Sequence, residues 1–225
     1  MDRRGDVVDV TDVTSVQETY DRIATHFAST REYAWPEVEA FVDEYVEIGD
    51  GHEVGLDLGC GNCRHAEVLA QHVERVVGLD VSRGLLETGR NRALKHGFSV
   101  DLVQGEAVSL PLRGNAVDVA VYVATIHHLP TRAARVASLD ELARVLDPGG
   151  SALVSAWSTA HDAFEETTGF DTTVEWTLPG GETVDRFYHI YDPDEFEADL
   201  ETSALETVSL EISSGNCYAV VQLRS

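Results

Sequence analysis

The sequence predicts an α/β fold in which a mostly parallel sheet is covered by helices on both faces. From residue 53 onward, short apolar segments alternate with segments of helical periodicity, as in parallel sheets buried on both sides. The chain ends with two strands, 207–212 and 217–223, whose connecting turn is so short that they must be antiparallel neighbours. With 225 residues, 43% of them hydrophobic, one core is expected rather than two. We therefore expect a single domain over residues 15–225.

Two helices are expected before the sheet begins. The first is predicted by apolar residues that recur at steps of four, three and four, namely Val16, Tyr20, Ile23 and Phe27. It should lie over the end of the sheet that binds a cofactor. The second begins at Pro36, which suits a first helical turn, and its apolar side consists of Val38, Phe41, Val42 and Tyr45. Residues 1–14 are acidic without clear periodicity and are predicted to be a loose tail.

After Gly49-Asp50-Gly51 the pattern becomes that of alternating strands and helices. The predicted strands, seven in all, are 53–58, 75–80, 99–104, 116–123, 151–157, 207–212 and 217–223. The predicted helices are 64–72, 82–96, 131–146 and 193–202. The third of these should end sharply at Asp147-Pro148-Gly149-Gly150. Residues 158–191, rich in Thr and Gly, are the least regular part and are predicted to be an insert over the substrate side.

The most informative motif is an apolar strand that breaks into two closely spaced glycines. Val54-Gly55-Leu56-Asp57-Leu58 runs into Gly59-Cys60-Gly61-Asn62, and the next apolar segment ends at Asp80. Glycines let the backbone pass close to a ligand, and an acidic residue roughly 20 positions further on can hold a pair of ribose hydroxyls. The motif therefore indicates a cofactor that contains adenosine.

The loop lacks what other adenosine cofactors require. A dinucleotide fingerprint needs a third glycine where this chain has Arg64, and a Walker loop needs a Gly-Lys pair, but the single lysine is Lys95. S-adenosylmethionine carries no phosphate and tolerates a carboxylate beside its ammonium group, so it is the cofactor we expect. The residues predicted to hold it are Asp57, Gly59, Cys60 and Gly61, with Asp80 on the ribose. In the alternative interpretation, the glycines only form a tight turn.

The charge of the chain indicates a high-salt environment. The formal net charge is -24, and the 16 basic residues are arginines except for one lysine. Such a surface repels itself and acidic polymers in dilute salt, whereas the Debye length falls to about 3 Å at 1 M salt. The composition resembles that of halophilic archaeal proteins. This reading weakens the objection to a nucleic-acid substrate without removing it.

The cysteines and the apolar segments predict a cytoplasmic protein. The three cysteines cannot all pair within one chain, so reduced thiols are expected. No apolar run approaches the roughly 20 residues that span a bilayer, and the first residues lack the apolar segment of a secretory signal, so no membrane partner is expected. Cys60 and Cys63 have the spacing of half a zinc site, to which His65 adds at most one ligand. We expect them to pack rather than to bind a metal.

Three further segments resemble one family. They are Tyr20-Asp21-Arg22-Ile23-Ala24 continuing through Phe27-Ala28-Ser29-Thr30-Arg31 to Trp35-Pro36, then Ile126-His127-His128-Leu129-Pro130-Thr131-Arg132, then Arg186-Phe187-Tyr188-His189-Ile190-Tyr191. Over residues 20 to 221 the chain is similar to the wobble-uridine tRNA methyltransferases, which esterify 5-carboxymethyluridine at position 34. These are class I S-adenosylmethionine-dependent enzymes with a Rossmann-like, seven-stranded sheet. The family usually has glycine where this chain has Cys63.

The resemblance implies a site built mainly for positioning. A carboxymethyl group has a reference pKa of about 4 and is ionised at neutral pH, so its attack on a methyl sulfonium needs no strong base. Arg31 and Arg186 match a carboxylate with their planar forks, and Tyr188 lies in the same segment. His127 and His128 follow a strand whose carboxyl end borders the binding crevice. Alternatively, the arginines form structural ion pairs and the histidines are caps bonded to nearby backbone.

The resemblance also extends the cofactor site and adds a stacking surface. Relatives contact the adenine where this chain has Glu106-Ala107, and they usually have Asp in place of Glu106. Val81 is expected to pack on the ring and Ala124 to line the floor. Aromatic side chains commonly stack on unpaired bases, and the candidates are Trp35, Trp157 and Trp176, each of which has core packing as its alternative.

The partners implied by the resemblance are a tRNA anticodon loop and a small zinc-containing activator protein, with no DNA partner. The activator would add a strand to the sheet edge at residues 99–103 and form a heterodimer. The first alternative function is a methyltransferase for a small carboxylate or phenol. The second is a noncatalytic module that binds S-adenosylmethionine and regulates a partner. Basic residues around the crevice would favour RNA, whereas a closed apolar pocket would favour a metabolite.

Overall fold

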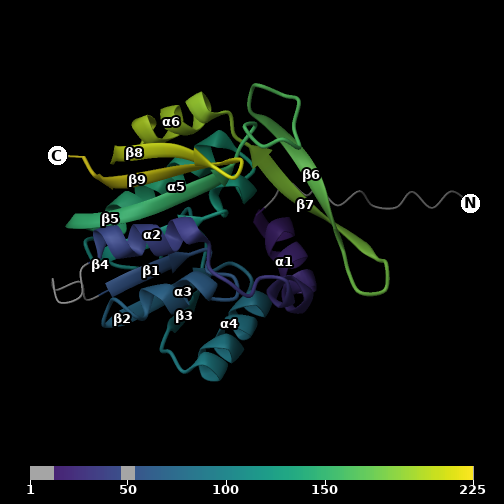
Figure 1. Ribbon diagram of the computed structural model, residues 1–225, viewed down its shortest axis with the longest axis horizontal. Coiled ribbons are helices and arrows are strands. Elements are labelled where there is room, and N and C mark those ends of the chain that lie inside the picture. The colour runs from purple at the N-terminus through teal and green to yellow at the C-terminus, as the bar shows by residue number, and fades with distance from the viewer. Residues whose placement is uncertain (1–12, 47–53, 225) are drawn as a thin grey trace, which may run out of the picture.

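Seven strands form one sheet in the order β3-β2-β1-β4-β5-β9-β8 in the computed structural model, which describes residues 13–46 and 54–224 (Figure 1). The strands are β1 (Val54–Leu58), β2 (Arg75–Asp80), β3 (Asp101–Gln104), β4 (Val117–Val123), β5 (Leu146–Trp157), β8 (Leu205–Ser213) and β9 (Asn216–Leu223). The first five pair in parallel, and β9 pairs antiparallel with both β5 and β8. This confirms the predicted sheet with its C-terminal hairpin.

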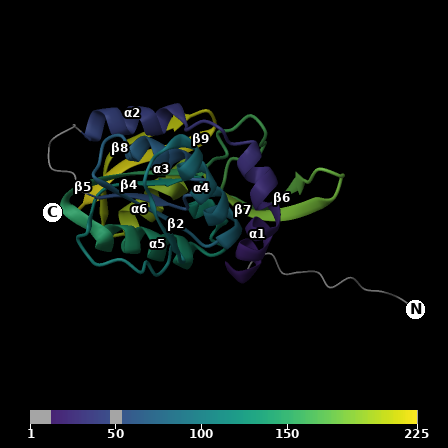
Figure 2. The same ribbon diagram turned by 90° about the horizontal axis from the view of Figure 1, so that it is seen from below.

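Helices cover both faces of this sheet, as Figure 2 shows. They are α1 (Val13–Ser29), α2 (Pro36–Tyr45), α3 (Arg64–Leu69), α4 (Arg83–His96), α5 (Arg132–Val145) and α6 (Pro193–Thr202). Strand β4 contributes to the apolar core on each face of the sheet, because successive side chains point to opposite faces. Val119, Val121 and Val123 pack with α2 and α3, whereas Ala120 and Tyr122 pack with α5 and α6.

Helix α1 is fixed at the end of the molecule that carries the carboxyl ends of the parallel strands. Asp21 of α1 accepts hydrogen bonds from the Gly84 N–H and the Ser82 hydroxyl at the start of α4, at 2.8 and 2.6 Å. A carboxylate at a helix N-terminus satisfies free N–H groups and complements the helix dipole. Ser82 also caps α4, since its Oγ accepts from the Leu85 N–H. This contact holds the apolar face of α1 toward the centre of the molecule.

Residues 158–191 are more regular than predicted. Most of the segment forms an antiparallel hairpin of β6 (Phe170–Thr177) and β7 (Thr183–Ile190), paired from Phe170 with Ile190 to Thr177 with Thr183. The hairpin lies beside α1 in both ribbon views. Along β6, exposed positions alternate with half-buried ones, the pattern of a strand with one covered face. The expectation of irregular structure was wrong, because it rested on the Thr and Gly content of the segment and not on the alternation of exposed and half-buried positions along it.

Several predicted boundaries shift. Helix α3 ends at Leu69, before the predicted end at 72, and β3 begins at Asp101 rather than at 99. Helix α5 ends at Val145 ahead of the Pro-Gly-Gly turn, but β5 already begins at Leu146, which pairs with Val117 before a register shift. Helix α1 begins at Val13, inside the predicted tail. The rest of that tail, Gly49-Asp50-Gly51 and the start of the strand predicted at 53 lie outside the described residues.

No helix within residues 13–46 and 54–224 combines the length and apolar character needed to cross a bilayer.

Candidate active site

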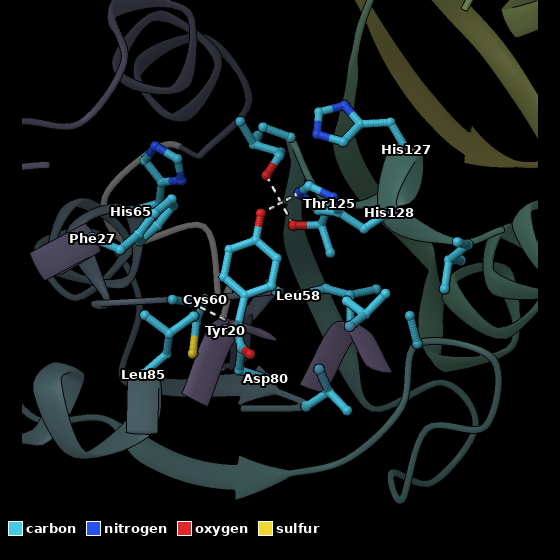
Figure 3. A pocket seen from close by; sticks show the side chains of 18 of the residues that line it. Tyr20, Phe27, Leu58, Cys60, His65, Asp80, Leu85, Thr125, His127 and His128 are labelled. Atoms are coloured by element: carbon cyan, nitrogen blue, oxygen red, sulfur yellow. Dashed lines mark hydrogen bonds between the residues drawn. The ribbon is translucent and has the colours of Figure 1, made fainter. Parts of the chain in front are cut away.

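A cavity of about 390 Å³ opens where β1, β2 and β4 end, between α1, the glycine loop and the β6–β7 hairpin. The predicted site residues that line it are Arg31, Gly59, Cys60, Gly61, Asp80, Val81, Glu106, Ala107, Ala124, His127, His128, Arg186 and Tyr188. Figure 3 shows the pocket with Asp80 and Leu58 toward one side and His127 and His128 toward the other. The glycine-loop residues and the arginine and histidine residues, far apart in sequence, therefore share one cavity.

The glycine loop is shaped for close approach by a ligand. Gly59 and Cys60 both donate backbone hydrogen bonds to the Leu79 carbonyl, at 2.7 and 2.9 Å, which turns the chain sharply after β1. Gly59 has φ +75°, and a Cβ there would lie 2.2 Å from Oγ1 of Thr125. Gly61 has φ +52° and nothing within 4 Å of its would-be Cβ. Gly59 therefore allows the loop to pack closely on Thr125, and Gly61 presents bare backbone to open space, which fits a bound adenosine derivative.

Asp80 occupies the position expected for a ribose acceptor. Its carboxylate accepts hydrogen bonds from the N–H groups of Gly61 and Ser82, both at 2.8 Å. Burial raises the pKa of Asp80 to about 6, although these two donors oppose the shift. The carboxylate is ionised at neutral pH and lines the cavity, so it has lone pairs available for hydroxyl groups.

Asp57, which is predicted to lie near the methionine portion of the cofactor, does not line the cavity. It is 1% exposed, and its carboxylate accepts a hydrogen bond from the Ala66 N–H at 2.9 Å. Burial raises the pKa of Asp57 to about 7, and the neighbouring Asp80 adds to the effect. Asp57 therefore lies beneath the glycine loop and ties β1 to the start of α3. The sequence could not distinguish a carboxylate above the loop from one below it.

Cys63 occupies a backbone position that favours glycine. Its φ of +63° lies in the left-handed region, directly before α3. The Cys63 sulfur packs against Gly89 of α4, where a Cβ would lie 2.5 Å from it. Cys60 and Cys63 are both buried free thiols, and no group of three or more His, Cys, Asp or Glu residues in the described chain could hold a metal ion. Packing accounts for both cysteines.

Arg186 is a buried guanidinium without a counterion. It is 6% exposed, and no carboxylate of the described residues lies within ion-pair distance of it. Its Nη1 donates to the hydroxyl of Tyr188 at 2.6 Å, its Nε has no partner in the structure, and its Cζ lies 4.9 Å from the Trp176 ring centroid. A buried charge is costly unless it is paired. Among so many acidic residues, this arrangement indicates that an anionic ligand completes the site.

Two more arginines line the same cavity without an ion pair to any described residue. Arg31 stacks on Phe27 and on Trp176, with Cζ 4.2 and 5.1 Å from the ring centroids. Arg64 lies 5.1 Å from the ring of Trp35. Burial lowers the pKa of Arg31, with a further contribution from Arg186, and burial together with Arg31 lowers the pKa of Arg64 to about 10. Arg31 thus repels both Arg186 and Arg64 when no anion is present. The alternative that Arg31 and Arg186 form structural ion pairs is not met among the described residues.

Both ring nitrogens of His128 are hydrogen-bonded within the protein. Its Nδ1 lies 2.9 Å from the Phe187 carbonyl, which can only accept, so the proton is on Nδ1. Its Nε2 therefore accepts from the Tyr20 hydroxyl, also at 2.9 Å, as the dashed line in Figure 3 shows. Burial lowers the pKa of His128 to about 4 and raises the pKa of Tyr20 well above its usual value. Both groups are neutral at pH 7, and together they join α1, the end of β4 and β7.

His127 has the opposite tautomer and a free donor. Its Nδ1 accepts a hydrogen bond from the Trp157 backbone N–H at 3.0 Å, so its proton is on Nε2. Burial lowers the pKa of His127 well below its usual value, and neighbouring His128 adds to this. Nε2 forms no hydrogen bond to the described residues, and the side chain lines the cavity. His127, rather than His128, can thus donate to a ligand.

The three predicted stacking tryptophans are largely occupied. The Trp176 ring centroid lies 5.1 and 4.9 Å from the Cζ atoms of Arg31 and Arg186, and the Trp176 Nε1 donates to His26 at 3.1 Å. Trp35 packs against Arg64 and Tyr218, and Trp157 against Phe164 and Tyr188. Trp35 and Trp157 line the cavity.

Tyr20 and Arg64 are site residues that the sequence reading missed. The sequence places Tyr20 on the apolar face of α1 and in a segment that resembles the family, without a role in the site, yet its hydroxyl reaches His128 inside the cavity. Arg64 was used only to argue against a dinucleotide. A hydroxyl-bearing side chain on an otherwise apolar face and an arginine directly after a ligand loop were the available signals.

Comparison with known proteins decides the family. A model described as a methyltransferase domain matches residues 56–154. The tRNA (carboxymethyluridine(34)-5-O)-methyltransferase of Schizosaccharomyces pombe is 31% identical over 167 residues, which are 72% of this chain and 68% of that protein. The chain belongs to this family of S-adenosylmethionine-dependent methyltransferases. S-adenosylmethionine is therefore the cofactor of this methyltransferase, and the observed glycine loop and Asp80 fit it.

Other proteins that resemble this methyltransferase match it over different shares of their own length. The enzyme of the same description from Macaca fascicularis is 34% identical over 143 residues, 64% of this chain, but the match spans only 20% of the Macaca protein. A solved complex between the Haloferax volcanii Trm112 methyltransferase activator and a methyltransferase partner shares the fold, with a TM-score of 0.68. That match is 15% identical and covers 94% of this chain and 98% of the Haloferax chain.

Proposed function

We propose that this methyltransferase esterifies the carboxylate of 5-carboxymethyluridine at the wobble position of tRNA. The observation that carries this proposal is Arg186, a buried cation with an unpartnered Nε at the end of the cavity away from Asp80. A carboxylate placed there would satisfy the guanidinium fork and relieve its repulsion with Arg31. Carboxymethyluridine methyltransferases among its relatives supply the nucleotide that carries such a carboxylate.

S-adenosylmethionine supplies an electrophilic methyl group, so that the new bond from the carboxylate oxygen to this carbon forms as the carbon–sulfur bond breaks and sulfur keeps the electron pair. The positive charge of the sulfonium and the negative charge of the carboxylate are both lost in this step. The chain's residues must therefore hold the carboxylate without stabilising its charge too strongly in the ground state. Arg31 and Arg186 are proposed to hold one oxygen and orient the other for attack.

The neutral histidines suit this requirement. His127 can donate from Nε2 to the bound carboxylate as a weak, uncharged donor, because its pKa lies well below neutrality. His128 and Tyr20 are proposed to hold His127 and Tyr188 in place rather than to contact the reacting oxygen, since both nitrogens of His128 are already bonded. Arg64, directly after the glycine loop, is available for the carboxylate of the cofactor's methionine portion.

The proposal is tested by transfer of label from S-adenosylmethionine to tRNA isolated from cells that lack this modification. We expect alkali-labile label at position 34, as a methyl ester requires, and no label on tRNA without the carboxymethyl group. Label elsewhere in the tRNA would replace the proposed substrate. Label on a small carboxylate or phenol but not on tRNA would support a metabolite methyltransferase. Cofactor binding without any transfer would support a noncatalytic regulatory module.

The lining of the pocket argues against a small phenol as the methyl acceptor. Three unpaired arginines line it, whereas its acidic lining residues are Asp80 and Glu106, both toward the cofactor end. A neutral phenol would leave the arginines unpaired. A small carboxylate satisfies the same groups, so the labelling comparison between metabolite and tRNA is the decisive one.

We also propose that a small zinc-containing activator pairs with β3. This strand is one edge of the sheet, so the outer side of its backbone is open to strand addition. Support comes from the fold shared with the Haloferax volcanii complex. Co-expression with such a protein should raise soluble yield and activity, and Leu102→Pro in β3 should prevent the association. Full activity of the lone chain would contradict an obligatory activator.

A further inference from the structure

Tyr33 is an exposed aromatic side chain beside the cavity. It is 81% exposed, and of the large apolar side chains exposed in residues 15–46 and 54–224 it is the aromatic one, the others being Leu94, Val208 and Ile212. The residues two positions before and after it, Arg31 and Trp35, both line the cavity. Tyr33 therefore stands at the rim of the pocket, and the structure gives it no packing role.

The backbone under Tyr33 is held rigidly. Three successive carbonyls accept hydrogen bonds from side chains of the scaffold: Arg31 from Asn62 at 2.8 Å, Glu32 from Arg92 at 2.6 Å, and Tyr33 itself from Arg64 at 3.4 Å. These donors come from the glycine loop, α3 and α4. Loops at a protein surface are usually held less firmly. A fixed loop that displays one aromatic ring to solvent is suited to binding, because little ordering is needed when a ligand arrives.

The charges around the ring favour a polyanion. Arg31 and Arg64 flank Tyr33 and form no ion pair to described carboxylates, although the chain carries 40 acidic residues. Single-stranded RNA is typically bound by aromatic rings that stack on bases, next to cations that neutralise phosphates. A strongly acidic surface elsewhere would confine such binding to this rim.

We propose that Tyr33 stacks on the unpaired base next to the methylated nucleotide, and so anchors the anticodon loop at the mouth of the pocket. This inference rests on the proposed tRNA substrate and assigns a second, outer contact to it. The target base enters the cavity, whereas its neighbour remains outside on the ring, and the positive charge of Arg31 and Arg64 attracts the RNA backbone to the mouth of the pocket without a direct phosphate contact.

The experiment compares Tyr33→Ala with Tyr33→Phe, which keeps the ring, and with Leu94→Ala, which removes an equally exposed side chain on α4 outside the cavity lining. Binding of a fluorescent, unmodified anticodon stem-loop is measured by anisotropy at fixed salt, and S-adenosylmethionine affinity is measured by calorimetry. Loss of one stacked base corresponds to about 5- to 150-fold weaker RNA binding. We expect this loss in Tyr33→Ala alone, with cofactor affinity unchanged in all three variants.

Methylation assays separate the two proposals. Tyr33→Ala should raise KM for a carboxymethylated stem-loop by the same factor but leave the rate with the isolated 5-carboxymethyluridine nucleoside unchanged. Equal RNA binding by Tyr33→Ala and the wild-type chain would overturn the inference while leaving the reaction intact. Weakened RNA binding in Tyr33→Phe as well would exclude stacking. If Tyr33→Ala instead abolishes association with the activator and keeps RNA binding, the surface belongs to a protein partner and the inference is wrong.

Discussion

The Arg186 guanidinium donates to the Tyr188 hydroxyl at 2.6 Å, and both side chains project from the same face of β7 into the cavity. The tyrosine oxygen is a neutral acceptor, so it orients the cation without neutralising it. A site with a fixed but unpaired charge is thereby prepared for an anion. The histidines beside it are neutral, which places the positive charge of this end of the pocket on the arginines.

Replacing Arg186 should strongly reduce transfer without removing the cofactor. Losing one partner of a buried charged pair costs about 2–5 kcal/mol, which corresponds to roughly 30-fold or more in kcat/KM for Arg186→Ala. Arg186→Lys should recover little, because an ammonium cannot both stack on Trp176 and bind a carboxylate in a bidentate manner. Initial rates with labelled cofactor measure this, with exposed Arg113→Ala as the control. Unchanged rates in Arg186→Ala would refute the anion site.

Cofactor affinity should depend on the ionisation of Asp80. Its pKa in the folded protein is raised to about 6, so the carboxylate that accepts ribose hydroxyls is depleted below that pH. We expect the Kd for S-adenosylmethionine to rise up to about tenfold per pH unit below pH 6 and to be constant above it. Calorimetry from pH 5 to 8 measures this. Asp80→Asn should bind weakly without the pH dependence, whereas exposed Asp101→Asn should behave as wild type.

The buried carboxyls of Asp80 and Asp57 should also make the stability of the fold depend on pH, in the opposite direction to cofactor affinity. Because the folded-state pKa values of Asp80 and Asp57 are raised to about 6 and about 7, the folded protein holds their protons more tightly than the unfolded chain. Their contribution to stability is fully present below about pH 4 and is lost as pH rises through these values. The stability difference between Asp57→Asn and wild type, from urea unfolding without cofactor, should therefore shift toward the variant between pH 5 and 8. A difference that stays constant would contradict the raised pKa values.

Removing the Tyr20 hydroxyl should disturb His128. Tyr20→Phe leaves Nε2 of His128 buried without a donor, which costs about 1–3 kcal/mol of unfolding free energy. Turnover should also fall, since the ring of His128 contacts both His127 and Tyr188. Tyr45→Phe, at a half-buried tyrosine of α2, is the matched control.

Since burial keeps both His127 and His128 neutral, the pH profile of kcat for the wild type should show no inflection near pH 6.5.

Stability should increase strongly with salt. A net charge of -24 destabilises the compact state by self-repulsion, which is screened as the Debye length shortens. We expect a higher Tm at about 2 M KCl than at about 0.1 M, where the Debye length is near 10 Å. Sucrose at matched osmolality is the control, since it leaves charge repulsion in place. A Tm that is insensitive to KCl would refute adaptation to high salt.

The sequence was sufficient for the sheet and the cofactor end of the site because these depend on local pattern. Strand alternation, the glycine positions and the acidic residue after β2 are each readable within a few residues. The position of Asp57 beneath the loop was not predictable, because a strand buried on both faces gives no signal for which side of the loop its side chain occupies. The tautomers of His127 and His128 depend on carbonyl and N–H groups of β7 and β5, which only the folded chain brings near.

The pairing of β6 with β7 has a consequence for how specificity can change. Arg186 and Tyr188 alternate along β7 with Phe187 and His189, and His189 is bonded on its other side by Asp171 and Glu195. Deleting one residue from this strand would rotate the following side chains to the opposite face, exchanging a cationic wall for an aromatic one. The hairpin forms its own two-stranded sheet, so the seven-stranded scaffold and its donor site would persist. Acceptor choice in this fold can therefore evolve by a single slip, independently of the cofactor.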